Sequence, residues 1–210
     1  MVVRKLAVAA IIAVAVAACG LTACDTKVGK AAIVDGHRIS ESQVVRYLTP
    51  EAAAVSVQTQ TGATGTIAPP AYVLNTLIQE RVFLRMLAST KAGRPSEGEI
   101  AKATRQALGA VTVAQAAQRN GIHGFTSAFD KLWVRVQILG LGLRQAAQQG
   151  VDVNALIGRL HFRVTVNPRY GRWDNKILAL SDLAVAGVPD FLSLDGVSSA
   201  PSAAAPAPTN

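Results

Sequence analysis

The residues of this chain with the clearest chemical signal are two cysteines near its start. Cys19 and Cys24 each follow small side chains, in the stretches VAAC and LTAC. Two such thiols can form a disulfide. Alternatively, a cysteine can be lipid-modified when a signal peptidase cleaves the chain just before it, and the peptidase needs small side chains beside the bond that it cuts. The segment that precedes the cysteines distinguishes these two chemistries.

That segment has the pattern of an export signal. Arg4 and Lys5 form a short positive region, and an unbroken apolar run covers residues 6–18. The run is too short for a helix that crosses a bilayer, which needs about 20 residues, and it has the length of the apolar part of a secretory signal. We therefore expect the chain to be exported.

Both cysteine stretches resemble the lipobox of bacterial lipoproteins, in which an aliphatic and two small residues precede the cysteine. Cys24 is the predicted lipidation site because Leu21 is the more typical aliphatic residue, and Cys19, directly after the apolar run, is the alternative. Cleavage before Cys24 predicts a signal peptide over residues 1–23 and a tether over residues 24–30. The mature chain then has no second cysteine for a disulfide, and we expect a lipid anchor on the extracytoplasmic face of the cell membrane.

The composition fits one cationic domain in that compartment. The 210 residues are half hydrophobic and include 21 Lys and Arg against 13 Asp and Glu, a formal net charge of +8. A chain of this length can bury one sizeable core. Because an exported protein is separated from nucleic acid, we expect the basic surface to face anionic lipid or wall polymer, and nucleic acid is not an expected partner.

Other residues with catalytic or ligand chemistry do not form a recognisable site. The sequence contains no G-x-S-x-G, H-E-x-x-H or Walker-type motif. The histidines fall in different predicted elements without a second ligand at metal spacing: His37, His123 and His161. The serines that precede predicted helices are interpreted as caps: Ser40, Ser96 and Ser127. We therefore expect no enzyme activity, no catalytic residue, no metal and no cofactor.

The elements that carry these residues are mostly helical. Three capping boxes predict helix starts, at Ser40 with Gln43, Ser96 with Glu99 and Thr112 with Gln115. Periodic apolar residues predict long helices over residues 72–90 and 127–149. The first of these is apolar around most of its circumference, which places it at the centre of the core.

A small amount of β-structure completes the prediction. Two short runs around Asp35 and Gly36 predict a hairpin, residues 160–167 alternate as a half-buried strand, and residues 177–180 are a further candidate strand. Residues 58–70 are rich in Gln, Thr, Gly and Pro and predict a mobile loop. The predicted domain covers residues 31–183, and the Ala, Ser and Pro-rich residues 184–210 predict a disordered tail.

The order of these elements resembles the SurA N-terminal-like chaperone module, the helical, peptide-holding part of the SurA and PrsA foldases of the bacterial envelope. The resemblance covers about Lys30 to Leu180 and lies in AAIVDGHRIS, in RPSEGEI and in the returning VTVNPRYGRWD. It implies a helical module closed by an N-terminal hairpin that pairs with a C-terminal strand. The family's enzymes also carry a parvulin domain of about 90 to 100 residues, which we expect to be absent because no such stretch remains.

The resemblance implies a membrane-anchored extracytoplasmic chaperone or foldase-like lipoprotein that binds unfolded secreted or envelope proteins without catalysis. Such binding needs a concave apolar surface, for which the helix over 72–90 and the loop over 58–70 are the sequence's candidates. The alternative is a structural or adaptor lipoprotein that docks one dedicated cell-envelope partner. Its contact would be the basic surface or the cluster of arginines and aromatics over residues 167–173, which we otherwise interpret as a lock at the strand exit.

Overall fold

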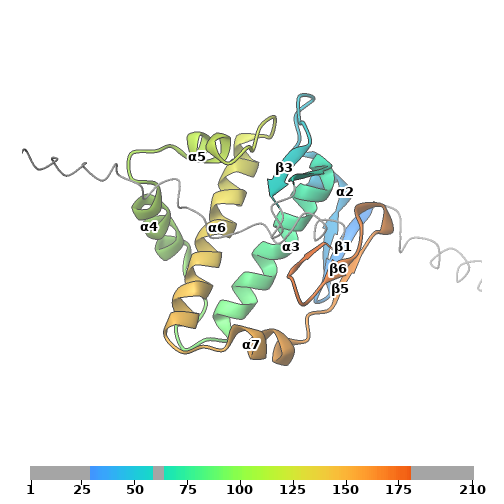
Figure 1. Ribbon diagram of the computed structural model, residues 1–210. Helices are drawn as coiled ribbons and strands as arrows, with labels where there is room; N and C mark the ends of the chain where they lie inside the picture. The colour runs from blue at the N-terminus through green and yellow to red at the C-terminus, as the bar shows by residue number, and fades with distance from the viewer. Residues whose placement is uncertain (1–28, 59–63, 181–210) are drawn as a thin grey trace, which may run out of the picture. The chain divides into compact units, whose positions relative to one another are not determined.

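The computed structural model describes residues 29–58 and 64–180 (Figure 1). The predicted signal peptide over 1–23, both cysteines, most of the tether and the predicted tail over 184–210 lie outside the described residues. The chain divides after Lys30 into a short N-terminal unit and a unit from Ala31 to Asn210. None of the described helices is long and apolar enough to cross a membrane.

The described residues are mostly helical, with three small antiparallel sheets ordered β2-β1-β5, β3-β4 and β6-β7, which confirms the coarse fold class. The helices are α2 (Glu41–Val45), α3 (Pro69–Ala88), α4 (Glu97–Leu108), α5 (Val113–Arg119), α6 (Ser127–Gln148), α7 (Val153–Leu160) and the short 3-10 helix η1 (Pro168–Tyr170). The strands are β1 (Lys30–Val34), β2 (His37–Ser40), β3 (Val55–Gln58), β4 (Thr64–Ile67), β5 (Val164–Val166), β6 (Trp173–Asp174) and β7 (Ala179–Leu180).

The helix starts follow the local signals in the sequence. Ser96 and Glu99 form the predicted capping box of α4, and Thr112 and Gln115 form that of α5. The Ser40 side chain accepts from the Gln43 amide at the start of α2. The predicted role of Ser127 is wrong: the N-cap of α6 is the preceding residue, and its side chain makes no capping hydrogen bond.

Helix α3 lies at the centre of the core, as its apolar circumference predicts. Val73, Leu74, Ile78, Val82 and Met86 are all fully buried on it. It packs along α6, with α4 and α5 on the α6 side and the β1 sheet and α2 on the α3 side (Figure 1). Each large apolar side chain that becomes fully buried stabilises the fold by about 1.5 to 3 kcal/mol. The packing of α3 against α6 is therefore the main source of stability.

The hairpin around the Asp-Gly turn forms as predicted, with β1 in the middle of its sheet. Asp35 and Gly36 have φ angles of 50° and 84°, the positive values that a type I′ turn requires. Strand β5 returns antiparallel to β1, in the register Ala32↔Val166, Ile33↔Thr165 and Val34↔Val164. The N-terminal hairpin and a strand from the far end of the described chain therefore share one sheet.

Strand β5 is shorter than its alternation predicts. Helix α7 continues to Leu160, and His161 ends it in the left-handed region at φ 42°, so only Val164 to Val166 remain extended. The Leu160 carbonyl accepts a hydrogen bond from Arg85 on α3, at 3.1 Å. This contact between distant residues holds the helix end in place, and no pattern within the strand sequence reveals it.

The loop predicted over residues 58–70 is wrong at both ends. Strands β3 and β4 pair antiparallel, with Val55 opposite Ile67, and both side chains are buried. From Pro69 onward the chain belongs to α3. The sequence did not predict these strands because each has only four residues. Polar residues and glycine also occupy positions where an alternating strand would carry apolar side chains.

The C-terminal part of the described chain is held against α3 by two buried amide side chains. Asn75 Oδ1 accepts from the Leu180 amide at 3.1 Å, and Gln79 Nε2 donates to the Leu178 carbonyl at 3.0 Å. Asn75 and Gln79 are 1 % and 2 % exposed, so each needs its partner to offset the cost of burial. The predicted strand over 177–180 is thus reduced to β7, which these contacts and β6 keep in place.

Candidate functional site

An open groove with a largely apolar lining lies between α4, α6 and the end of α3. Its volume is about 490 Å³. Small and apolar side chains dominate its lining, among them Leu87, Ile100, Ala103, Ala107, Leu139 and Ala146. We call this surface the α4–α6 groove.

Helix α4 forms one wall through residues with helical spacing. Ile100, Ala103 and Ala107 recur at offsets of three and four and face the groove together. The capping box determines where α4 begins, because Glu99 accepts from the Ser96 amide at 2.7 Å. Hydrogen bonds from the backbone and side chain of Ser96 lower the pKa of Glu99, so this groove residue carries its charge at neutral pH.

Helix α6 forms the other wall and approaches α3 closely at a glycine. A Cβ atom at Gly142 would lie 3.4 Å from Leu87 Cδ2 on α3, an ordinary contact distance with no room to spare. The two helices thus lie in contact at the end of the groove.

The polar residues of the groove are mainly amides. Gln106, Gln145 and Gln149 line it and are exposed. Among residues 29–58 and 64–180, none of these three side chains makes a hydrogen bond. Their carbonyl and NH₂ groups can therefore accept from and donate to the main chain of an extended peptide whose side chains enter the groove.

An ion cluster beside the groove ties α4 to the two long helices. Arg135 on α6 donates to Glu97 on α4 through two hydrogen bonds of 2.5 and 2.6 Å. Its Nε lies 2.6 Å from Glu80 Oε1 on α3, an ion pair outside hydrogen-bonding geometry. The hydrogen bond from Arg135 lowers the pKa of Glu97, so this carboxylate is charged at neutral pH. It holds the groove wall in position.

The two segments that the sequence suggested for an apolar surface do not form the groove. The apolar side chains of helix α3 pack in the core, and Leu87 is its only residue that lines the groove. The β3–β4 hairpin contributes no residue. In the sequence, the groove is indicated by the spacing of small residues on α4. This spacing was not recognised as a signal because alanine is common on any helix.

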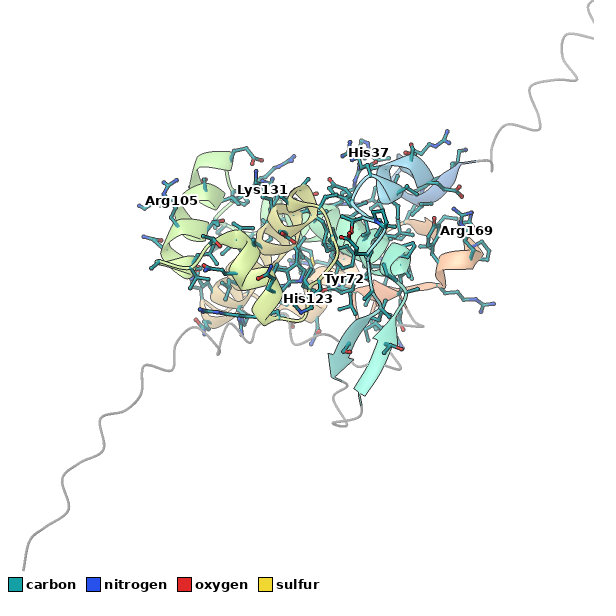
Figure 2. All side chains as sticks on the ribbon, turned by 90° about the horizontal axis from the view of Figure 1, so that it is seen from above. His37, Tyr72, Arg105, His123, Lys131 and Arg169 are labelled. Atoms are coloured by element: carbon teal, nitrogen blue, oxygen red, sulfur yellow. The ribbon has the colours of Figure 1, made fainter. Side chains whose placement is uncertain are left out.

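The histidines are spread over separate elements, as their sequence positions indicate. His37 lies on β2, His123 in the turn before α6 and His161 at the end of α7, and Figure 2 shows the first two on different parts of the fold. Within the described residues no three His, Cys, Asp or Glu side chains gather as a metal site would require. The predicted lipidation site Cys24 lies outside the described residues.

The cluster over residues 167–173 has structural contacts. Asn167 accepts from the Arg169 amide and so caps η1, and Tyr170 is buried against α3. Arg169 lies 4.7 Å above the Tyr170 ring and pairs with Glu41 at 2.7 Å. The Trp173 indole donates to Asn175 at 2.8 Å. These contacts lock the exit of β5, in agreement with the structural interpretation of the motif.

Comparison with known proteins gives no assignment. No family model, no curated protein and no solved structure matches the chain.

Proposed function

We propose that this chain is a membrane-anchored extracytoplasmic lipoprotein of the chaperone type, which holds short apolar segments of unfolded exported polypeptides in the α4–α6 groove without catalysis. The observation that carries the proposal is the groove itself. A volume of about 490 Å³ lies within the range of ligand pockets, roughly 300 to 1,000 Å³, and its walls are mostly apolar. The pairing of β1 with β5 also agrees with the closure implied by the SurA N-terminal-like resemblance.

The rest of the described surface supports this location for the binding site. Val45 is the one large hydrophobic side chain among the described residues that is well exposed, at 60 %. A protein that binds unfolded chains needs accessible apolar area, and a single valine supplies little. In the α4–α6 groove, apolar side chains and an accessible concavity coincide.

The size of the groove predicts weak binding. It has room for two or three client side chains, each contributing about 2 kcal/mol on burial. Their sum, roughly 4 to 6 kcal/mol, corresponds to dissociation constants from about 1 mM to tens of micromolar. Weak binding of short segments with adaptable amide contacts suits a protein that must release its clients.

The test is aggregation suppression by the chain from residue 25 onward with two unrelated denatured proteins. Ala103→Arg places a long charged side chain in the groove, and Ala114→Arg places the same side chain on the exposed surface of α5. At protein concentrations of about 100 μM or more, which exceed the tighter end of the predicted dissociation constants, we expect the parent chain and Ala114→Arg to protect both clients, also at high salt. Ala103→Arg should lose most of this protection.

Protection of neither client by the parent chain would contradict the holding function. So would protection that disappears once salt screens the charges, because apolar contacts persist at high ionic strength. Either result favours the alternative, an adaptor lipoprotein that docks one dedicated cell-envelope partner through its basic surface.

A further inference from the structure

A second hollow, lined partly by charged side chains of α3, has a different character. It lies between the β1–β2 turn and α3 and has a volume of about 700 Å³. Its charged and titratable lining residues are Asp35, His37, Arg81, Arg85 and Arg94. We call it the arginine hollow.

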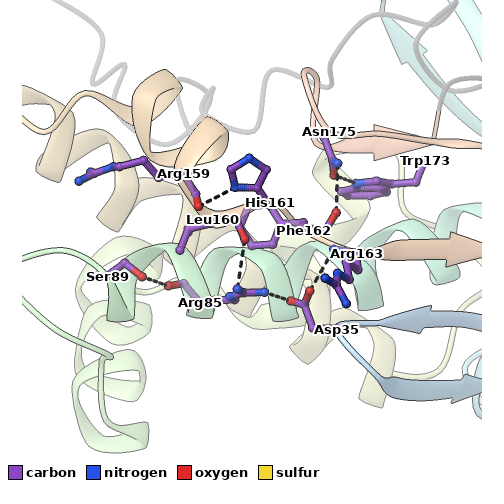
Figure 3. A network of polar contacts seen from close by, with 10 residues as sticks. All are labelled: Asp35, Arg85, Ser89, Arg159, Leu160, His161, Phe162, Arg163, Trp173 and Asn175. Carbon is purple, nitrogen blue, oxygen red and sulfur yellow. Dashed lines mark hydrogen bonds and ion pairs between the residues drawn. The ribbon is translucent and has the colours of Figure 1, made fainter.

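One of its arginines is held by the fold. Arg85 pairs with Asp35, donates to the Leu160 carbonyl at 3.1 Å and lies 5.3 Å from the centre of the Phe162 ring (Figure 3). Asp35 also accepts from the Arg163 amide at 3.0 Å. These contacts orient the Arg85 guanidinium and neutralise its charge, so that it forms a wall of the hollow.

The other two arginines are not neutralised in this way. Arg81 lies one helical turn before Arg85 and is half-buried, and it makes no hydrogen bond or ion pair with any other described residue. Arg94 lies near Glu97, but both oxygens of that carboxylate accept from Arg135. The guanidiniums of Arg81 and Arg94 therefore leave positive charge in the hollow that an anion can compensate.

The geometry points to a phosphate-binding site, and we propose that Arg81 and Arg94 bind a phosphate group in the arginine hollow. Three guanidiniums and one carboxylate give a local charge of +2 with neutral histidine. A phosphate carries about −1.5 to −2 at neutral pH and matches this charge, whereas a carboxylate leaves half of it uncompensated. The planar fork of arginine also fits two phosphate oxygens at once.

The test measures binding of inorganic phosphate to the full chain in non-ionic detergent at low salt, by isothermal titration. We expect Arg81→Gln and Arg94→Gln each to raise Kd about 10-fold, as loss of a charged hydrogen bond does. Arg119→Gln, an exposed arginine on α5, should leave Kd unchanged. Asp35→Asn should lower Kd, because it removes the one carboxylate that lines the hollow among the described residues.

Equal weakening by Arg81→Gln and Arg119→Gln would overturn the proposal, because it would show attraction by net charge alone. Binding of acetate as tight as that of phosphate would overturn it as well. Flotation of the chain from residue 25 onward, which lacks the lipid-anchored cysteine, with phosphatidylglycerol vesicles in detergent-free buffer separates two sources of the phosphate. If the chain floats with the vesicles and Arg81→Gln abolishes flotation, the bound phosphate is that of a lipid headgroup. If the chain binds phosphate but does not float, the ligand is a soluble phosphate. Both results support the site. The groove variant Ala103→Arg should bind phosphate normally, so this proposal and the holding function stand or fall separately.

Discussion

Asp35 is the residue whose replacement tests the long-range contacts of the fold most directly. It occupies a turn position with φ 50°, pairs with Arg85 and accepts from the Arg163 amide (Figure 3). Its side chain thus joins the β1–β2 turn to α3 and to the start of β5. Three substitutions separate the charge, the hydrogen bonds and the backbone conformation.

The expected losses in unfolding free energy follow from these contacts. Asp35→Asn keeps an acceptor and tolerates the positive φ but loses the charge, and because Arg85 is 42 % exposed we expect a loss of about 1 kcal/mol. Asp35→Gly removes both hydrogen bonds without backbone strain and should cost about 2 kcal/mol. Asp35→Ala adds the cost of a left-handed residue with a Cβ, about 1 kcal/mol more.

The same residue predicts a pH dependence. Burial raises the pKa of Asp35, but hydrogen bonds from Arg85 and the Arg163 amide outweigh it and leave the pKa below its ordinary value of 3.8. The stabilisation is therefore complete above the pKa of the unfolded chain and disappears as the pH falls through the lower folded value. The difference between parent and Asp35→Asn should stay constant from about pH 7 to 5 and shrink below about pH 4.

The assay is urea unfolding followed by circular dichroism, for the parent and the three variants at each pH. Taking differences between parent and Asp35→Asn cancels the contributions of the other carboxylates. The reasoning is refuted if Asp35→Asn is as stable as the parent at pH 7, or if the difference does not shrink in acid. It is also refuted if Ala and Gly at this position are equally stable, since the strain argument requires Ala to be worse.

Three further outcomes are expected. The buried Trp133 indole N–H donates to the Tyr72 hydroxyl at 3.0 Å, and Tyr72→Phe leaves it without a partner. Urea unfolding should show that the free energy of unfolding falls by about 1 to 3 kcal/mol. A loss near zero would mean that water reaches the indole. Gly158→Ala has open space around its new methyl and should gain about 0.5 to 1 kcal/mol, whereas Gly142→Ala should gain less because of its 3.4 Å contact with α3; equal gains would show that α3 yields freely. Cys24→Ala should abolish incorporation of labelled palmitate in growing cells, and retained labelling would move the lipidation site to the other cysteine.

The turns and helix starts could be read from the sequence. The Asp35–Gly36 turn and the capping boxes at Ser96 and Thr112 occur where their residues predict them. Each depends on hydrogen bonds between residues at most four apart or on the φ angles of one or two residues. Such energies are nearly independent of the rest of the chain, so the local pattern suffices.

The candidate sites could be read only in part. The small residues of α4 are visible in the sequence, but a groove exists only because α6 and the end of α3 lie beside them. The arginine hollow joins Arg81 and Arg94 with a turn at Asp35, which lies 46 residues before the first arginine and 59 before the second. No spacing rule relates residues that far apart, because the intervening chain can close in many ways.

The sequence by itself determined that the described residues are mostly helical, where most helices begin, and which helix is buried around most of its circumference. Tertiary contacts decided where α7 ends, that Val55 and Ile67 pair within a hairpin, and which chain segment covers α3. The Arg85 contact with Leu160 and the Gln79 contact with Leu178 span 75 and 99 residues. Buried polar groups need hydrogen-bond partners, and in these contacts the partners come from segments distant in the sequence. Only the complete tertiary structure brings such segments together, so no local pattern predicts the contacts.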